Sequence, residues 1–126
     1  MDLTTAENLT RLIYLDVHKV EETHTSHQFG VKRVLSKGFA ELFQIKQIAI
    51  GALNQGEDIA EHVHLDMDEH YYFLEGEGTM FVNGYEFALK EGIFLNVPAT
   101  AKHSLICSSG TLRFLYFSMA VGEKTI

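Results

Sequence analysis

The fold is decided by the stretch Gly56–Gly76, which reads GEDIAEHVHLDMDEHYYFLEG. His62 and His64 lie two residues apart, and side chains at that spacing leave an extended strand on the same face. Glu69 follows His62 at an odd offset, so an unbroken strand would aim its carboxylate at the opposite face. A bend over Leu65–Asp68 would restore the parity. Two imidazoles and one carboxylate would then converge, which gives three corners of a divalent metal site.

A second segment, from Gly92 to His103, predicts a fourth ligand. It reads as a turn, a short strand, a stiff turn at Pro98 and the start of another strand. His103 could supply a third imidazole from across a barrel. Three nitrogens and one carboxylate would leave two octahedral positions open for water, dioxygen or a bidentate substrate. We therefore predict one divalent transition metal per chain, and Fe, Mn, Ni and Zn all suit these ligands.

The two segments resemble the two signature motifs of the cupin superfamily. The chain is similar to small, single-domain cupins of the bacterial type, the conserved-barrel family. The first motif matches at all its diagnostic positions, which are Gly56, His62, His64, Glu69 and Gly76. The second matches at Gly92, Pro98 and His103, but Thr100 replaces the usual glycine and Cys107 the frequent asparagine. The short spacer, 77–91, is that of compact cupins.

The rest of the chain predicts an all-β fold. Short apolar stretches at close spacing indicate strands, and we place them at 31–35, 39–53, 70–74, 79–82, 85–89, 93–97, 102–107 and 111–119. Asn83-Gly84 predicts a tight hairpin, because a type I′ turn needs positive φ at both central residues. About nine strands without a central helix predict an antiparallel double-sheet barrel. The resemblance implies the same fold, a jelly roll or double-stranded β-helix.

The length of 126 residues predicts a single domain. Residues 1–30 are expected to form an arm that packs on a barrel spanning residues 31–126. Thr4–Leu12 could be a short helix with Thr4 as its cap, and 13–20 an arm or edge strand. Because open sheet edges invite pairing and cupins of this size are commonly dimers, we predict a homodimer.

Composition excludes some partners and suggests a location. A formal charge of −7 argues against nucleic acid or an anionic membrane, since both attract a basic surface. The chain has no run of about 18 apolar residues. Its one cysteine cannot form an internal disulfide, which suits a reducing cytoplasm. We expect a cytoplasmic protein.

Strand parity also predicts a substrate pocket beside the metal ligands. Tyr71 and Phe73 share the parity of Glu69, and Leu105 and Cys107 share that of His103. Tyr71 could donate a hydrogen bond to a substrate oxygen, whereas plain core is the preferred interpretation of Phe73 and Cys107. The resemblance implies a further pocket residue, Gln47, whose amide faces the pocket in similar small cupins; an exposed strand residue is the competing interpretation.

Other polar residues have two interpretations. His18, His24 and His27 belong either to a solvated arm or to an arm that covers the barrel mouth, where His27 would be a second catalytic candidate beside Tyr71. His70 should face away from the metal. Asp66 and Asp68 are expected to be solvated turn residues, although either could orient a ligand imidazole.

The predicted function is a metal-dependent enzyme acting on a small organic molecule chelated by the metal, most simply an oxygenase such as a dioxygenase. The same ion without redox change could serve an isomerase or epimerase of a sugar or keto compound. A third hypothesis is a non-catalytic module that binds a small ligand. A polyphosphorylated substrate is disfavoured, because the motifs contain few cationic residues beyond Lys102.

Overall fold

The computed structural model describes residues 16–37 and 45–121. A 3₁₀ turn at Val17–Lys19 is followed by β1 (Glu22–His24), β2 (Val31–Lys37), β3 (Ile45–Asn54), β4 (Asp58–His62), β5 (Met67–Val82), β6 (Tyr85–Leu89), β7 (Phe94–Val97) and β8 (His103–Ala120). The expected helix at Thr4–Leu12 and the start of the strand expected at 39–53 lie outside the described residues. Within them, no helix is long and apolar enough to cross a membrane.

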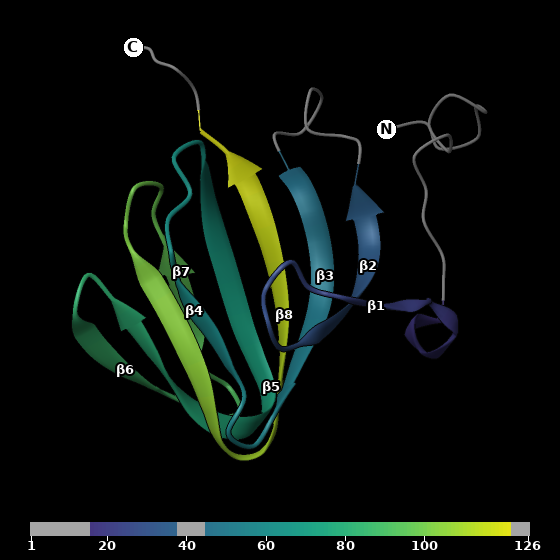
Figure 1. Cartoon of the computed structure of the whole chain (residues 1–126). Helices are drawn as coiled ribbons and strands as arrows, with labels where there is room; N and C mark the ends of the chain where they lie inside the picture. Colours follow the sequence, from purple (N-terminus) through teal and green to yellow (C-terminus); the bar gives the residue numbers. More distant parts are fainter. Residues whose placement is uncertain (1–15, 38–44, 122–126) are drawn as a thin grey trace.

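The two longest strands, β5 and β8, each contribute to both layers of the fold. The first part of β5 pairs antiparallel with the last part of β8, and its second part pairs with the first part of β8. The chain β1-β2-β3 extends one layer, which also contains β7, while β4 and β6 extend the other. Figure 1 shows the strands curving around a common interior, with β3 between β2 and β8. The predicted all-β antiparallel barrel is confirmed.

The strands differ from the prediction in their number and length. The short strands β1 and β4 were not among those predicted. The stretches 70–74 and 79–82 are one bent strand, β5, and 102–107 and 111–119 are one bent strand, β8. Register shifts between Phe73 and Gly78 mark the bend in β5. Bulges of this kind turn a strand without ending its pairing, so the residues that read as linkers lie inside strands. The Asn83-Gly84 hairpin is present, with φ of 49° and 85°.

Gly76 makes the bend possible. Its φ is +83°, and a Cβ added there would lie 2.2 Å from the backbone oxygen of Thr111. The left-handed conformation is costly for other residues, and the contact with the facing strand leaves no room for a methyl group. The second layer of the barrel therefore depends on a residue without a side chain at this position.

The hydrophobic core fills the space between the two layers. Its largest fully buried apolar side chains are Phe73, Leu53, Met80, Leu105 and Leu112. Three polar side chains are buried among the described residues, namely Glu69, His103 and Ser118. A buried carboxylate and a buried imidazole are stable only with hydrogen-bonding or charged partners. Such partners are therefore expected at the end of the barrel where these side chains lie.

We predict that Gly76→Ala lowers the free energy of unfolding by about 3 kcal/mol or more, because left-handed strain and overpacking act together. Gly92→Ala is the matched control. Gly92 has a similar φ of +91° but nothing within 4 Å of an added Cβ, so its cost should be about 1–2 kcal/mol. Urea unfolding measures both, and equal losses would contradict the close-approach explanation.

Candidate metal centre

The four predicted ligands come from three strands and one connection. His62 ends β4 and lies directly opposite His103 at the start of β8, so their side chains leave the sheet on the same face. Glu69 comes from β5, and His64 from the connection between β4 and β5. The bend that restores parity is shorter than predicted: it occupies Leu65 and Asp66, and β5 already begins at Met67.

The ligand atoms of these residues converge. One nitrogen or oxygen atom from each of His62, His64, Glu69 and His103 lies within 4.8 Å of all the others. The Nε2 atoms of His103 and His64 lie 3.1 and 3.5 Å from Oε1 of Glu69. Small side-chain adjustments would place all four atoms about 2.0–2.2 Å from one cation, the range expected for nitrogen and carboxylate ligands.

Backbone carbonyls orient two of the imidazoles for metal binding. Nδ1 of His62 lies 2.8 Å from the Ala60 oxygen, and Nδ1 of His103 lies 3.1 Å from the Ala101 oxygen. A carbonyl oxygen only accepts hydrogen bonds, so Nδ1 carries the hydrogen in both rings. Nε2 is then the nitrogen that each ring presents to the common centre and would offer to a metal, as in metal-binding histidines whose other nitrogen is fixed by a hydrogen bond. This observation shows that the residues fit a metal.

The turn before His103 is tied to the other ligands. The Thr100 amide donates a 2.7 Å hydrogen bond to the His64 carbonyl, and Thr100 has a φ of 75°. The left-handed conformation that favours glycine is therefore kept despite the substitution. Asp68 accepts a 2.7 Å hydrogen bond from the Ala99 amide, so it is a structural strand residue and not the solvated turn residue expected. Asp66 is exposed.

Burial and neighbouring groups favour the metal-binding protonation state of two ligands, His62 and Glu69. Burial, assisted by the nearby histidines, lowers the pKa of His62, although the Ala60 hydrogen bond opposes this. Burial alone would raise the pKa of Glu69, but hydrogen bonds from His103 and Tyr71 outweigh it and the pKa is lowered. A neutral imidazole and an ionised carboxylate are the forms that bind metal.

Two tyrosines stand beside this cluster as neutral hydrogen-bond donors. The Tyr71 hydroxyl donates a 2.7 Å hydrogen bond to Oε1 of Glu69. Burial, and then the negative charge of Glu69, raise the pKa of Tyr71 well above its usual value. The same two causes raise the pKa of Tyr116 to about 12. Both phenols therefore keep their protons at neutral pH.

A cavity of about 200 Å³ opens beside the four ligands. Tyr71 and Gln47, two of the five expected pocket residues, are among the residues that line it. The other three predicted pocket residues, Phe73, Leu105 and Cys107, belong to the buried core cluster and are not among the lining residues. They share the predicted inward parity, but they lie where the two layers pack together and leave no space.

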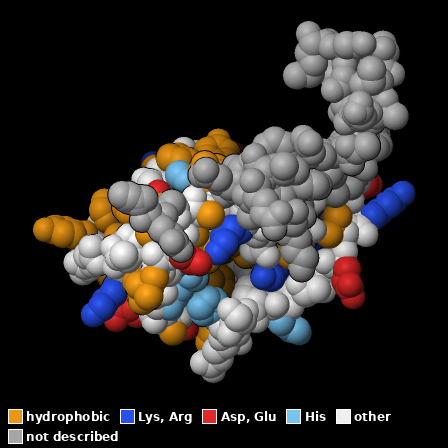
Figure 2. Space-filling view, turned by 90° about the horizontal axis from the view of Figure 1, so that it is seen from above, with side chains coloured by type: hydrophobic (Ala, Val, Ile, Leu, Met, Phe, Trp, Pro, Cys, Tyr) orange, Lys and Arg blue, Asp and Glu red, His pale blue; other side chains and the backbone are white. Residues whose placement is uncertain are grey.

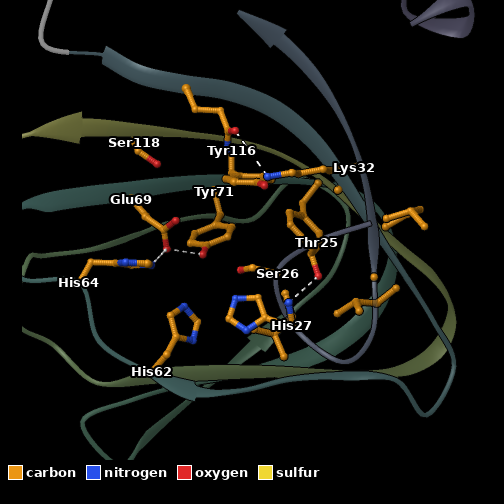
Figure 3. Close-up of a pocket in the computed structure, with 18 of the residues that line it drawn as sticks. Thr25, Ser26, His27, Lys32, His62, His64, Glu69, Tyr71, Tyr116 and Ser118 are labelled. Carbon is orange, nitrogen blue, oxygen red and sulfur yellow. Dashed lines mark hydrogen bonds and ion pairs between the residues drawn. The ribbon is translucent and has the colours of Figure 1, made fainter. Parts of the chain in front are cut away.

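His27 reaches the cavity from the loop between β1 and β2. Its ring centre lies 4.6 Å from that of His62, and the two rings lie side by side in Figure 3. Thr25 shapes this loop: its hydroxyl donates to the Phe29 carbonyl at 2.8 Å and accepts from the His27 amide at 3.2 Å. Burial, together with His64, His103 and Lys32, lowers the pKa of His27, while Glu69 opposes them.

The other histidines stay away from this centre. His18 and His24 are exposed. His70 stacks on Phe117, with ring centres 4.7 Å apart, and on Phe94, which agrees with its predicted outward direction. Figure 2 shows histidine side chains gathered on the face seen from above, with lysine or arginine side chains near them.

Sequence reasoning missed several residues of the cavity wall, namely Thr25, Ser26, Lys32, Met67, Tyr116 and Ser118. Tyr116 and Ser118 lie at even offsets from Phe114 in β8, so their side chains leave the strand on the same face as that of Phe114. This alternation could be read from the sequence. Lys32 stands beside Arg33 in the sequence, and two adjacent cations on one strand do not reveal which of them faces inward.

We predict that removing any one ligand, as in His62→Ala, His64→Ala, His103→Ala or Glu69→Gln, weakens binding of a divalent transition metal by at least about 100-fold. Even removing a group that only orients a ligand typically costs about 10–100-fold. His24→Ala is the control, because it removes an exposed histidine. Competition with a chromogenic chelator measures the affinities, and unchanged binding in a ligand variant would contradict the assignment.

The chain matches known proteins over this region. A family model described as the cupin domain matches residues 49–118. Quercetin 2,3-dioxygenase of Bacillus subtilis (strain 168) is 44% identical over 50 residues, which cover 40% of this chain and 15% of that protein. Dimethylsulfoniopropionate lyase DddW of Ruegeria pomeroyi is 29% identical over 69 residues, 55% of this chain and 45% of that protein. The chain thus spans less than half the length of both relatives.

The fold has close counterparts among solved structures. The crystal structure of a predicted oxalate decarboxylase from Thermotoga maritima superimposes with a TM-score of 0.79 and 22% identity, covering 86% of this chain and all of that one. At this identity the likeness concerns the fold alone. The matched family region covers more than half of the sequence and contains all four candidate ligands, and the chain belongs to the cupin domain family.

Proposed function

We propose that this cupin is a metal-dependent enzyme, and specifically an oxygenase that acts on a small organic molecule chelated by the metal. The observation that carries the proposal is the convergence of three imidazoles and one carboxylate at the wall of a cavity. A four-residue ligand set leaves coordination positions for substrate or dioxygen. A bound redox-active cation would supply dioxygen activation and polarise a substrate oxygen.

The side chains around the ligands have separate roles in this proposal. Tyr71 holds Glu69 by its hydrogen bond and keeps its proton at neutral pH, so it orients the carboxylate. His27 stands next to His62 at the cavity wall, where it can contact a substrate. The apolar walls, including Leu53, Ile59 and Phe114, exclude water from the reacting groups.

The cavity volume restricts the substrate. The volume of about 200 Å³ is the space of about seven liquid water molecules, and it lies below the usual range of about 300–1,000 Å³ for ligand pockets. The likeness to a quercetin dioxygenase covers 15% of that protein, so it supports the type of reaction more than the identity of the substrate.

Oxygen uptake tests the proposal. We expect the iron-loaded protein to consume dioxygen with at least one member of a panel of small catechols, enediols, β-diketones and hydroxy acids. Glu69→Gln should remove the activity and the exposed-site variant His24→Ala should keep it. No uptake above that of Glu69→Gln with any compound would contradict an oxygenase.

A non-redox reaction is the second candidate, and the partial likeness to a lyase is the observation that favours it. Here a bound cation would act only as a Lewis acid, and the protein groups would move protons in an isomerisation or elimination. Turnover by the zinc-loaded protein without dioxygen would favour this reaction over the oxygenase.

We also infer that the protein is a homodimer and that it acts in the cytoplasm. Tyr72 and Phe94 pair across β5 and β7 and are 44% and 60% exposed, so their outward face offers apolar area for a second copy. Light scattering should give twice the mass of the chain, and a concentration-independent monomer would contradict the dimer. The cytoplasmic location stays a prediction from the single cysteine.

A further inference from the structure

A lysine faces into the cavity from β2. Lys32 lies opposite Gly51 in the β2–β3 register, and directly paired residues project from the same face of a sheet. Gly51 faces the interior, because an added Cβ would lie 2.7 Å from the Phe114 ring. Lys32 is accordingly one of the residues that line the cavity, and Figure 3 shows its side chain among them.

The ammonium group of Lys32 has spare hydrogen-bonding capacity. Its one hydrogen bond to another described residue is a long one, 3.5 Å to Oε1 of Gln47. No carboxylate of the described chain lies within 4.0 Å of it, whereas the outward-facing Lys46 and Arg113 have carboxylate partners at 2.9 and 2.6 Å. A lysine has three N–H donors, so donors of Lys32 remain for a ligand.

The charges of the cavity favour an anion. Glu69 is the one carboxylate among the lining residues. Its Oε1 atom already contacts Nε2 of His103 and accepts a hydrogen bond from the Tyr71 hydroxyl. With a divalent cation bound, the +2 of the ion, the −1 of Glu69 and the +1 of Lys32 sum to +2 around neutral imidazoles. This local excess of positive charge contrasts with the net charge of −7 of the whole chain. It attracts small anions into the cavity.

We propose that the cavity binds a small carboxylic acid at two points. One end of the molecule chelates the metal through oxygen atoms, and the carboxylate at the other end binds Lys32, with the Gln47 amide and the Tyr116 hydroxyl as neighbouring hydrogen-bonding groups. Gln47 links these groups, because it also contacts the Tyr116 side chain. The substrate class is a hydroxy- or keto-carboxylic acid that fits about 200 Å³. This inference rests on the metal centre of the proposed function.

Binding of matched hydroxamates tests the two-point arrangement. The probes are the monohydroxamates of malonic, succinic and glutaric acid, each compared with its terminal amide, which has the same shape without the charge. The nickel-loaded protein is titrated calorimetrically with each pair. We expect at least one carboxylate probe to bind about tenfold more tightly than its amide, the size of a hydrogen bond to a charged group.

Substitutions assign the preference to Lys32. Lys32→Met should reduce the preference for the carboxylate probe over its amide to less than about twofold, while nickel content and amide binding stay unchanged. Lys32→Arg should retain the preference. Lys90→Met, which removes an exposed lysine in the turn between β6 and β7, is the matched control. Equal binding of acid and amide by the wild type at all three lengths, or an undiminished preference in Lys32→Met, would overturn the inference.

A metal-free titration separates this inference from the metal function. The monoamide of glutaric acid has one carboxylate and no strong chelating group, so the part of its binding to the metal-free protein that depends on Lys32 reports on this subsite. We expect weak binding that Lys32→Met reduces by about tenfold. An unchanged dissociation constant in this variant would contradict the subsite. Failure of the wild type to retain nickel would instead contradict the metal-dependent function and leave this second measurement decisive for Lys32.

Discussion

The structure depends on a carboxylate that is buried among imidazoles. Glu69 is 7% exposed, and an ionised carboxyl group in that position is tolerated only when other groups compensate its charge. His103 and Tyr71 lie within hydrogen-bonding distance of one of its oxygens, and His64 is 3.5 Å away. A cation shared by Glu69 and the three histidines would compensate the charge further. This need for charge compensation brings side chains of β4, β5 and β8 together at one end of the barrel.

The two bent strands explain why the centre forms where it does. β5 and β8 pass through both layers, so Glu69 and His103 lie on strands that the bends at Gly76 and Gly110 bring together. Both glycines have positive φ, and their backbones approach closely. Gly76 belongs to the same sequence motif as His62, His64 and Glu69, and Gly110 lies outside it. The two glycines allow the bends that close the barrel, and the closed barrel positions the ligands.

The sequence predicted the parts of this arrangement that follow from local parity and spacing. His62 and Tyr71 face the cavity because side chains alternate along strands, and the Asn83-Gly84 turn follows from its backbone requirement. His64 joins them from the connection between β4 and β5, not from a strand. The sequence could not predict that strands continue through their glycines, since bulges depend on the partner strand. It also could not separate Phe73 and Cys107, which pack in the core, from Tyr71, because parity fixes direction and not depth. Lys32 and His27 enter the site from β2 and its loop through long-range pairing that local patterns do not reveal.

The cavity has two chemically different parts, the candidate metal centre and Lys32. Aromatic and apolar side chains line the walls between them. The most direct test is a crystal structure of the cobalt-loaded protein with anomalous scattering data. The account predicts a single strong anomalous peak about 2.0–2.2 Å from one nitrogen of each of His62, His64 and His103 and from a Glu69 oxygen. A peak that excludes Glu69 or His103, or a barrel without any peak at this position, would contradict it.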